Sequence, residues 1–275
     1  MVSLVAALAL VLLAVGVGLG AGVLIARAGH RHDPLDETGF VADGLSATLG
    51  TVGGLLAFTL GFLVVFTLDN FTAAQDVASR EASAYGAAFE SAAVIPAAES
   101  EAVRRNVACL TQAVRDEGWL LDRTSATQAD DNIEEWWLKT RESLVSLPER
   151  TPFEEFATET VFTSIAEART LGENRLLMQE PMIPAIIWVL IYLAFGAVVT
   201  LTYVALRFNT FILLTSVGLM TLVVGAVIAA LITFAAPFSR SDGTSVEADD
   251  LTATIERLRD TYPGPAWDPC ERLAP

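Results

Sequence analysis

The amino-acid sequence predicts an all-α integral membrane protein. We expect four transmembrane helices, a long second helix that protrudes from the membrane, and a helical extramembrane domain between spans two and three. Three observations lead to this fold class. Hydrophobic residues make up 53% of the 275 residues, which is more than a soluble domain usually carries. Four charge-free runs (2–26, 44–68, 182–206 and 208–239) each reach the roughly 20 apolar residues that cross a bilayer. Finally, residues 69–180 hold 21 acidic but only 10 basic side chains.

The first expected element is a transmembrane helix over residues 1–27. The sequence Ala26-Arg27-Ala28 resembles a signal-peptide cleavage site, but the apolar run exceeds the usual length of such a peptide and no basic residue precedes it. Two GxxxG pairs in this run are typical of a helix that packs closely on another. A short loop, 28–43, follows. Its His30 and His32 are expected to be solvated rather than to bind a metal.

The second element, 44–95, is predicted to be a transmembrane helix that continues beyond the membrane as a rod. No proline occurs before Pro96, so one helix of roughly 50 residues, about 75 Å long, is expected. Two stripes at helical spacing mark its apolar half. The helix-packing candidates are Gly50, Gly54, Ala57 and Gly61. The aromatic stripe consists of Phe58, Phe62 and Phe66.

Residues 96–181 are predicted to form the helical extramembrane domain, packed on the rod. Amphipathic patterns indicate helices over 99–121, 133–145 and 153–177, with a polar linker over 124–132. Thr151 followed by Pro152, with acids in the first turn, is typical of a helix start. Spans three and four, 182–206 and 209–236, should form a tight hairpin because the short stretch around Arg207-Phe208-Asn209 is all that separates them. The last segment, 237–275, is expected to contain a short helix over 250–262 and an irregular tail.

Two cysteines, Cys109 and Cys270, are too few for a closed zinc site. Four spans place both on the same side of the membrane, so they either form a disulfide or remain two unrelated thiols. No metal and no cofactor is expected. The strongly acidic balance, −16 overall, argues against nucleic acid as a partner.

Orientation rests on the basic residues of the short loops. Arg27, Arg31 and Arg207 lie in the two loops predicted on one side, and such loops usually face the cytoplasm. The large domain and the C-terminus are therefore expected outside a multi-pass plasma-membrane protein.

Short motifs along the chain resemble a bacterial membrane-protein family labelled bestrophin-like. In that family a Glu-Ala-Asn-Ala-type stretch follows the second span on the same helix. Glu81 and Ala82 match it, and Ser83 replaces the asparagine. Arg169 and Arg175 resemble the family's arginine pair before the third span. Weaker matches are Glu117-Gly118-Trp119 for a Glu-Trp-Pro element, Pro184 with Trp188, and Pro237-Phe238, where Ala236 replaces a frequent acid.

The resemblance implies a remote relation to bestrophins, which are pentameric anion channels with bulky apolar side chains lining a neck on the second span. Phe58, Phe62 and Phe66 are the corresponding pore-neck candidates, although such a stripe can equally pack or face lipid. Bestrophins keep the domain between spans two and three in the cytosol, which disagrees with the orientation expected from the arginines. We also expect Glu81 to pair with Arg169 or Arg175, joining the domain to the rod.

An enzyme is not expected, because none of the four apolar runs contains Asp, Glu, Lys, Arg or His and no nucleophile–base arrangement appears. Three functional hypotheses remain. The chain is an oligomeric anion-channel-like pore lined by the second span, a non-conducting scaffold or envelope sensor that acts through its acidic domain, or a pore with a cation-attracting vestibule. The expected partners are the bilayer, further copies of the chain and, for the first hypothesis, a small anion.

Overall fold

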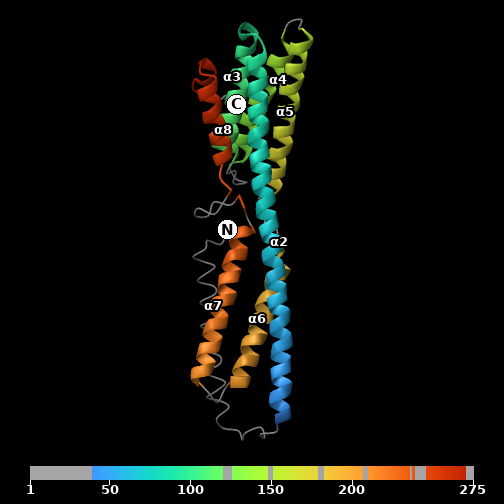
Figure 1. Ribbon diagram of the computed structural model, residues 1–275, viewed down its shortest axis with the longest axis vertical. Helices are drawn as coiled ribbons and strands as arrows, with labels where there is room; N and C mark the ends of the chain where they lie inside the picture. The colour runs from blue at the N-terminus through green and yellow to red at the C-terminus, as the bar shows by residue number, and fades with distance from the viewer. Residues whose placement is uncertain are drawn as a thin grey trace. The chain divides into compact units, whose positions relative to one another are not determined.

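The computed structural model describes residues 39–119, 126–147, 151–178, 183–206, 210–235, 237–238 and 246–270. Within these ranges all regular structure is helical (Figure 1). The chain divides into two compact units. Unit 1 comprises Met1–Phe71 and Pro181–Ala236, and unit 2 comprises Thr72–Glu180 and Pro237–Pro275. The first predicted span, residues 1–27, and the loop 28–43 lie almost entirely outside the described residues.

One uninterrupted helix, α2 (Gly39–Val94), contributes to both units. It begins five residues before the predicted start at residue 44, and it ends just before Pro96, whose ring cannot continue a helix. Its two parts bury different side chains. In unit 1 the buried face is built from leucines, whereas in unit 2 it is mainly alanine, including Ala74, Ala78 and Ala82, each at most 2% exposed. Alanines let neighbouring backbones approach α2 closely in unit 2.

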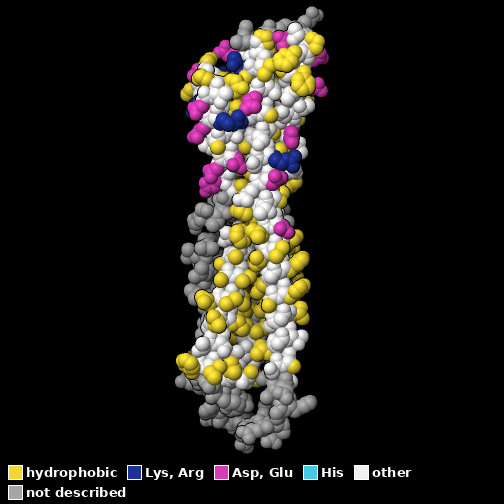
Figure 2. Space-filling view, viewed as in Figure 1, with side chains coloured by type: hydrophobic (Ala, Val, Ile, Leu, Met, Phe, Trp, Pro, Cys, Tyr) yellow, Lys and Arg dark blue, Asp and Glu magenta, His cyan; other side chains and the backbone are white. Residues whose placement is uncertain are grey.

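Unit 1 contains the first part of α2 together with α6 (Ala185–Leu206) and α7 (Thr210–Phe234). Three helices among the described residues are long and apolar enough to cross a membrane, and these are the three. They share one apolar core. Its buried members are Leu56, Leu60, Leu63, Ile183, Ile191, Val198, Val224, Ile228, Leu231 and Ala235. On the visible face in Figure 2 their side chains are mostly apolar, and charged side chains gather over unit 2.

Unit 2 packs short helices around the second part of α2. They are α3 (Ala97–Ala113), the π-helical turn η1 (Val114–Gly118), α4 (Ala126–Val145), α5 (Pro152–Leu177), α8 (Asp249–Thr261) and the 3-10 turn η2 (Pro265–Trp267). Helix α5 begins where Thr151, Pro152 and the acids of the first turn predict a helix start. Thr151 accepts a hydrogen bond from the Glu154 amide, and the Glu154 carboxylate accepts one from the Thr151 amide. This reciprocal capping box satisfies two amides that a helix start otherwise leaves unpaired.

Two expectations for this region are wrong in detail. The helix expected over 133–145 begins earlier, because α4 starts at Ala126. The tail after α8 is not irregular throughout, because η2 buries Ala266 and Trp267. In the structure the end of α2 and residues 237–275 fall in the same compact unit as the segment 96–180.

Candidate functional site

The aromatic stripe of α2 lies on the face turned away from the unit 1 core. Phe58, Phe62 and Phe66 are 75%, 63% and 43% exposed. Leu60 and Leu63, on the packed face of the same helix, are 5% and 6% exposed. The rings of Phe62 and Phe66 stack with their centroids 6.4 Å apart. The described part of a single chain therefore leaves an aromatic face uncovered along the charge-free segment 44–68 of α2.

The small-residue stripe also has no partner among the described residues. A Cβ built on Gly50, Gly54 or Gly61 would meet nothing within 4 Å, and Ala57 is exposed. Packing of α2 against α6 and α7 uses the leucine face instead. The expectation that the first span docks on this stripe concerns residues outside the described ranges.

A second candidate centre lies inside unit 2, where α2 and α5 carry a buried ion pair. Arg175 donates from Nε to Glu81 Oε2 at 2.8 Å, and its Nη2 lies 3.5 Å from Oε1. The two side chains are 3% and 1% exposed. Two charges this far from solvent are tolerated only when their remaining hydrogen-bonding groups are satisfied.

The π-helical turn η1 and the residue that follows it supply the remaining acceptors for the guanidinium. Arg175 Nη1 donates to the carbonyl oxygens of Gly118 and Trp119 at 3.0 and 3.2 Å. The guanidinium also lies over the Trp119 ring, 4.3 Å from its centroid. Gly172, one helical turn before Arg175, leaves room for the carboxylate, since a Cβ there would lie 3.1 Å from Glu81 Oε1. A glycine, a widened helical turn and an aromatic ring together enclose the pair.

The electrostatics of this centre follow from its burial. Burial raises the pKa of the Glu81 carboxyl above its ordinary 4.5, and the charge and hydrogen bonds of Arg175 offset part of that rise. The pKa of Tyr85, one turn further along α2, is also raised, first by burial and then by the Glu81 charge. At neutral pH the Tyr85 hydroxyl is therefore protonated.

The second arginine, Arg169, does not reach Glu81. It pairs with Glu134 at 3.0 Å and with Glu173 at 3.5 Å, and its side chain is 42% exposed. Of the two arginines that could pair with Glu81, the structure brings only Arg175 to it.

Residues from the C-terminal segment complete this centre. Trp119 Nε1 donates to the carbonyl oxygen of Val246 at 3.1 Å, and the Trp119 ring meets Phe238 edge-on with centroids 6.3 Å apart. Sequence reasoning missed Trp119 as the residue that covers Arg175, although it had marked both Glu117-Gly118-Trp119 and Pro237-Phe238 as motifs. Their meeting point could not be read from the sequence because the two motifs are far apart in the chain.

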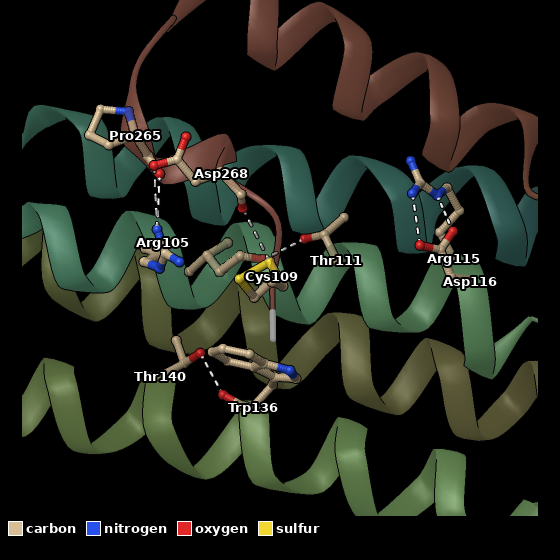
Figure 3. Close-up of a disulfide and its surroundings, with 11 residues drawn as sticks. Arg105, Cys109, Thr111, Arg115, Asp116, Trp136, Thr140, Pro265 and Asp268 are labelled. Carbon is tan, nitrogen blue, oxygen red and sulfur yellow. Dashed lines mark hydrogen bonds and ion pairs between the residues drawn. A yellow bond between two sulfur atoms is a disulfide. The ribbon is translucent and has the colours of Figure 1, made fainter. Parts of the chain in front are cut away.

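Cys109 on α3 and Cys270 after η2 form a disulfide with Cα atoms 5.6 Å apart (Figure 3). Nearby, Arg105 Nη1 donates to the Pro265 carbonyl oxygen at 3.2 Å and lies 3.9 Å from the Asp268 carboxylate. The cross-link thus attaches the end of the described chain to α3.

Within the described ranges, no three His, Cys, Asp or Glu side chains gather as a metal site would require. His30 and His32 lie outside those ranges. The candidate sites are therefore the aromatic face of α2 and the enclosed ion pair of unit 2.

Comparison with known protein families shows to which family the chain belongs. A model of the bestrophin-like domain matches residues 4–249. The chain belongs to the bestrophin-like family. This confirms the resemblance noted in its motifs, and with the three apolar helices it identifies a membrane protein.

A solved structure supports the fold of this bestrophin-like chain. A bacterial bestrophin homolog from Klebsiella pneumoniae, crystallised as a point mutant, superposes with a TM-score of 0.68 at 11% sequence identity. The match covers 92% of this chain and 99% of the other. No curated protein matches the sequence. At this identity the likeness establishes the architecture, and the roles of individual residues have to come from this chain itself.

Proposed function

We propose that this bestrophin-like protein is an oligomeric membrane channel for small anions, in which α2 of each copy lines the pore. One observation carries the proposal: the rings of Phe58, Phe62 and Phe66 form an uncovered face on a helix whose opposite face is packed. Family membership makes a channel the relevant class of function.

Several copies of α2 around an axis would place three successive aromatic rings along a narrow neck. Ring edges carry partial positive charge, so they favour a passing anion without holding it as tightly as an arginine would. An apolar constriction also excludes water until it widens, which provides a gate. The small-residue stripe beside the rings would allow neighbouring helices to approach closely.

The test is halide flux through vesicles that contain the purified full chain, with Phe62→Ala as the main variant. The matched control is Phe211→Ala, which removes an equally large ring, 79% exposed, from α7. We expect halide flux above that of empty vesicles, a changed rate or selectivity for Phe62→Ala, and no change for Phe211→Ala. A lack of halide flux in several lipid mixtures would overturn the proposal, and so would an equal effect of the two variants.

The acidic surface of unit 2 supports a second candidate, a non-conducting scaffold that binds a basic partner protein. Acidic residues outnumber basic ones 21 to 10 in residues 69–180 and 8 to 4 in residues 237–275. Such a surface repels anions and attracts cations at low ionic strength. Flux of cations rather than halides in the same vesicles would favour the cation-attracting vestibule, whereas a chain that stays monomeric in lipid and conducts nothing would favour the scaffold.

We also propose that unit 2 faces the extracytoplasmic side. Disulfides persist in oxidising compartments and are rare in the cytosol, and both cysteines lie in unit 2. The arginines of the two short loops support the same orientation. A membrane-impermeant maleimide applied to intact cells should label Cys270 only after treatment with an impermeant reductant. Labelling that requires cell lysis would show the opposite orientation.

A further inference from the structure

The two sulfurs of the Cys109–Cys270 disulfide lie in different surroundings. Cys109 is in the middle of α3 and is fully buried. Cys270 is partly exposed and follows η2 in a stretch without helical structure. A thiolate approaching from solvent can therefore reach the Cys270 sulfur, while α3 and its neighbours shield the Cys109 sulfur.

We call the stretch Pro265–Cys270 the terminal strap. Its η2 turn packs on α3 and buries Ala266 and Trp267. The Trp267 ring stacks on Phe89 of α2 with centroids 4.8 Å apart, and its Nε1 donates to the Tyr262 carbonyl oxygen at 3.0 Å. Arg105 of α3 contacts the backbone at Pro265 and lies 3.9 Å from the Asp268 carboxylate, an exposed ion pair that contributes little. Among the contacts that the described residues show, the disulfide is the covalent one, and it fixes the end of the strap to α3.

The helix before the strap is held differently. Leu251, Ile255 and Leu258 of α8 are each at most 1% exposed, and Arg257 of α8 pairs with Glu90 of α2 at 2.6 Å. Helix α8 therefore has its own apolar anchor and does not depend on the disulfide. Loss of the cross-link should free the terminal strap and leave α8 in place.

We propose that this disulfide is a redox-operated clasp that opens from the Cys270 side. A dithiol reductant attacks Cys270 Sγ with one thiolate. The bond between the two cysteines breaks, its electron pair leaves on Cys109 Sγ, which then takes up a proton, and a mixed disulfide forms at Cys270. The second thiol of the reductant displaces Cys270 as a thiolate, so the reductant becomes a disulfide and the protein a dithiol, with two electrons transferred.

Opening the clasp would uncover a specific apolar surface. Phe89 is 1% exposed, with the Trp267 ring 4.8 Å and the Tyr262 ring 5.9 Å from it between centroids. When Trp267 leaves with the terminal strap, the face of the Phe89 ring on which it stacks becomes accessible, while Tyr262 keeps its own contact. The oxidation state of two cysteines would then decide whether this surface can be contacted.

The first experiment maps the site of attack on the full chain in detergent without denaturant. The oxidised, folded protein is treated with limiting glutathione and then unfolded in the presence of the alkylating reagent and digested, and the glutathione adduct is located by mass spectrometry. We expect the adduct on Cys270 and the alkylated thiol on Cys109. Adducts distributed equally over both cysteines, or a disulfide that is reduced only after denaturation, would overturn the proposal.

The second experiment follows hydrogen exchange before and after reduction. The Trp267 and Asp268 amides, which donate to Gly264 and Pro265, should lose protection, while the α8 amides around Ile255 keep theirs. Loss of protection in α8 at the same time would show that the disulfide stabilises the whole C-terminal segment rather than the terminal strap alone.

Single-cysteine variants supply matched controls. In Cys109→Ser the remaining Cys270 should react with maleimide in the folded protein. In Cys270→Ser the buried Cys109 should stay unlabelled until the protein is unfolded. The readouts are labelling and exchange, so they remain decisive even if the channel proposal fails.

Discussion

Replacing Arg175 by methionine should destabilise unit 2 strongly. Methionine keeps an apolar stem but removes the guanidinium, which leaves the Glu81 carboxylate at 1% exposure without its partner. It also removes the donor to the carbonyl oxygens of Gly118 and Trp119. Removing one member of a buried pair typically costs about 3–5 kcal/mol. For a folding unit of roughly 150 residues, a loss of this size lowers Tm by about 6–20 °C.

The matched control is Arg169→Met on the same helix. Arg169 is 42% exposed and makes its two ion pairs near the surface, so its loss should cost less than about 1 kcal/mol. Thermal unfolding of the full chain can be followed by tryptophan fluorescence, because four of the five tryptophans lie in unit 2. The double variant Glu81→Leu with Arg175→Met should recover much of the loss, since no uncompensated charge remains.

Equal Tm values for the two arginine variants would refute this reasoning. A double variant as unstable as Arg175→Met would show that the lost contacts to the Gly118 and Trp119 carbonyl oxygens, rather than the unpaired Glu81 carboxylate, account for the loss of stability.

Three further predictions concern the same unit. Burial raises the folded-state pKa of Glu81. The contribution of Glu81 to stability is therefore fully present below about pH 4.5 and falls as the pH rises through the folded-state pKa. In urea titrations at several pH values, the difference in unfolding free energy between wild type and Glu81→Gln should decrease over that rise, and a constant or increasing difference would contradict this. Gly172→Ala should cost about 1–3 kcal/mol, because its Cβ would lie 3.1 Å from the carboxylate that Arg175 binds. At Gly118 the new Cβ would lie closer to its neighbour, 2.6 Å from Ile133 Cδ1, but that atom is the end of a side chain that can rotate away, so Gly118→Ala should cost less. The reverse order in thermal unfolding would be inconsistent with this packing. Thr151→Ala should lower stability by about 1 kcal/mol through loss of the α5 cap, measured as a shift in denaturation midpoint, while Thr151→Ser should preserve it.

Local signals in the sequence predicted much of the fold. The charge-free runs predicted α6 and α7, whose bounds, Ala185–Leu206 and Thr210–Phe234, lie within a few residues of the expected spans. The cap at Thr151 predicted the start of α5. Both signals act within one helix, so they can be recognised without knowledge of the tertiary structure.

The choice between Arg169 and Arg175 as partner of Glu81 could not be made in this way. The two arginines are six positions apart, which places them on different faces of α5, about 120° apart around the axis. Their roles depend on how α5 is rotated against α2. That rotation is set by buried residues of α5 such as Val161, Ile165 and Ala168, and no pattern in either helix alone specifies it.

The aromatic face of α2 illustrates a different limit. Sequence spacing correctly places Phe58, Phe62 and Phe66 on one side of the helix, and the structure shows that side uncovered in the described part of a single chain. What covers or lines that side lies beyond the described part of one chain, so spacing within a single helix does not predict it.

The division of unit 2 into two stretches of sequence also determines how the protein can be made. Its second stretch, 237–275, follows both helices of the α6–α7 pair in the chain. During synthesis, Trp119 cannot meet Val246, and Cys109 cannot meet Cys270 across their 161-residue separation, until that pair has been produced. Unit 2 therefore lacks these contacts until α6 and α7 have been translated. Its last contacts form only after a helix pair that belongs to unit 1 has been made.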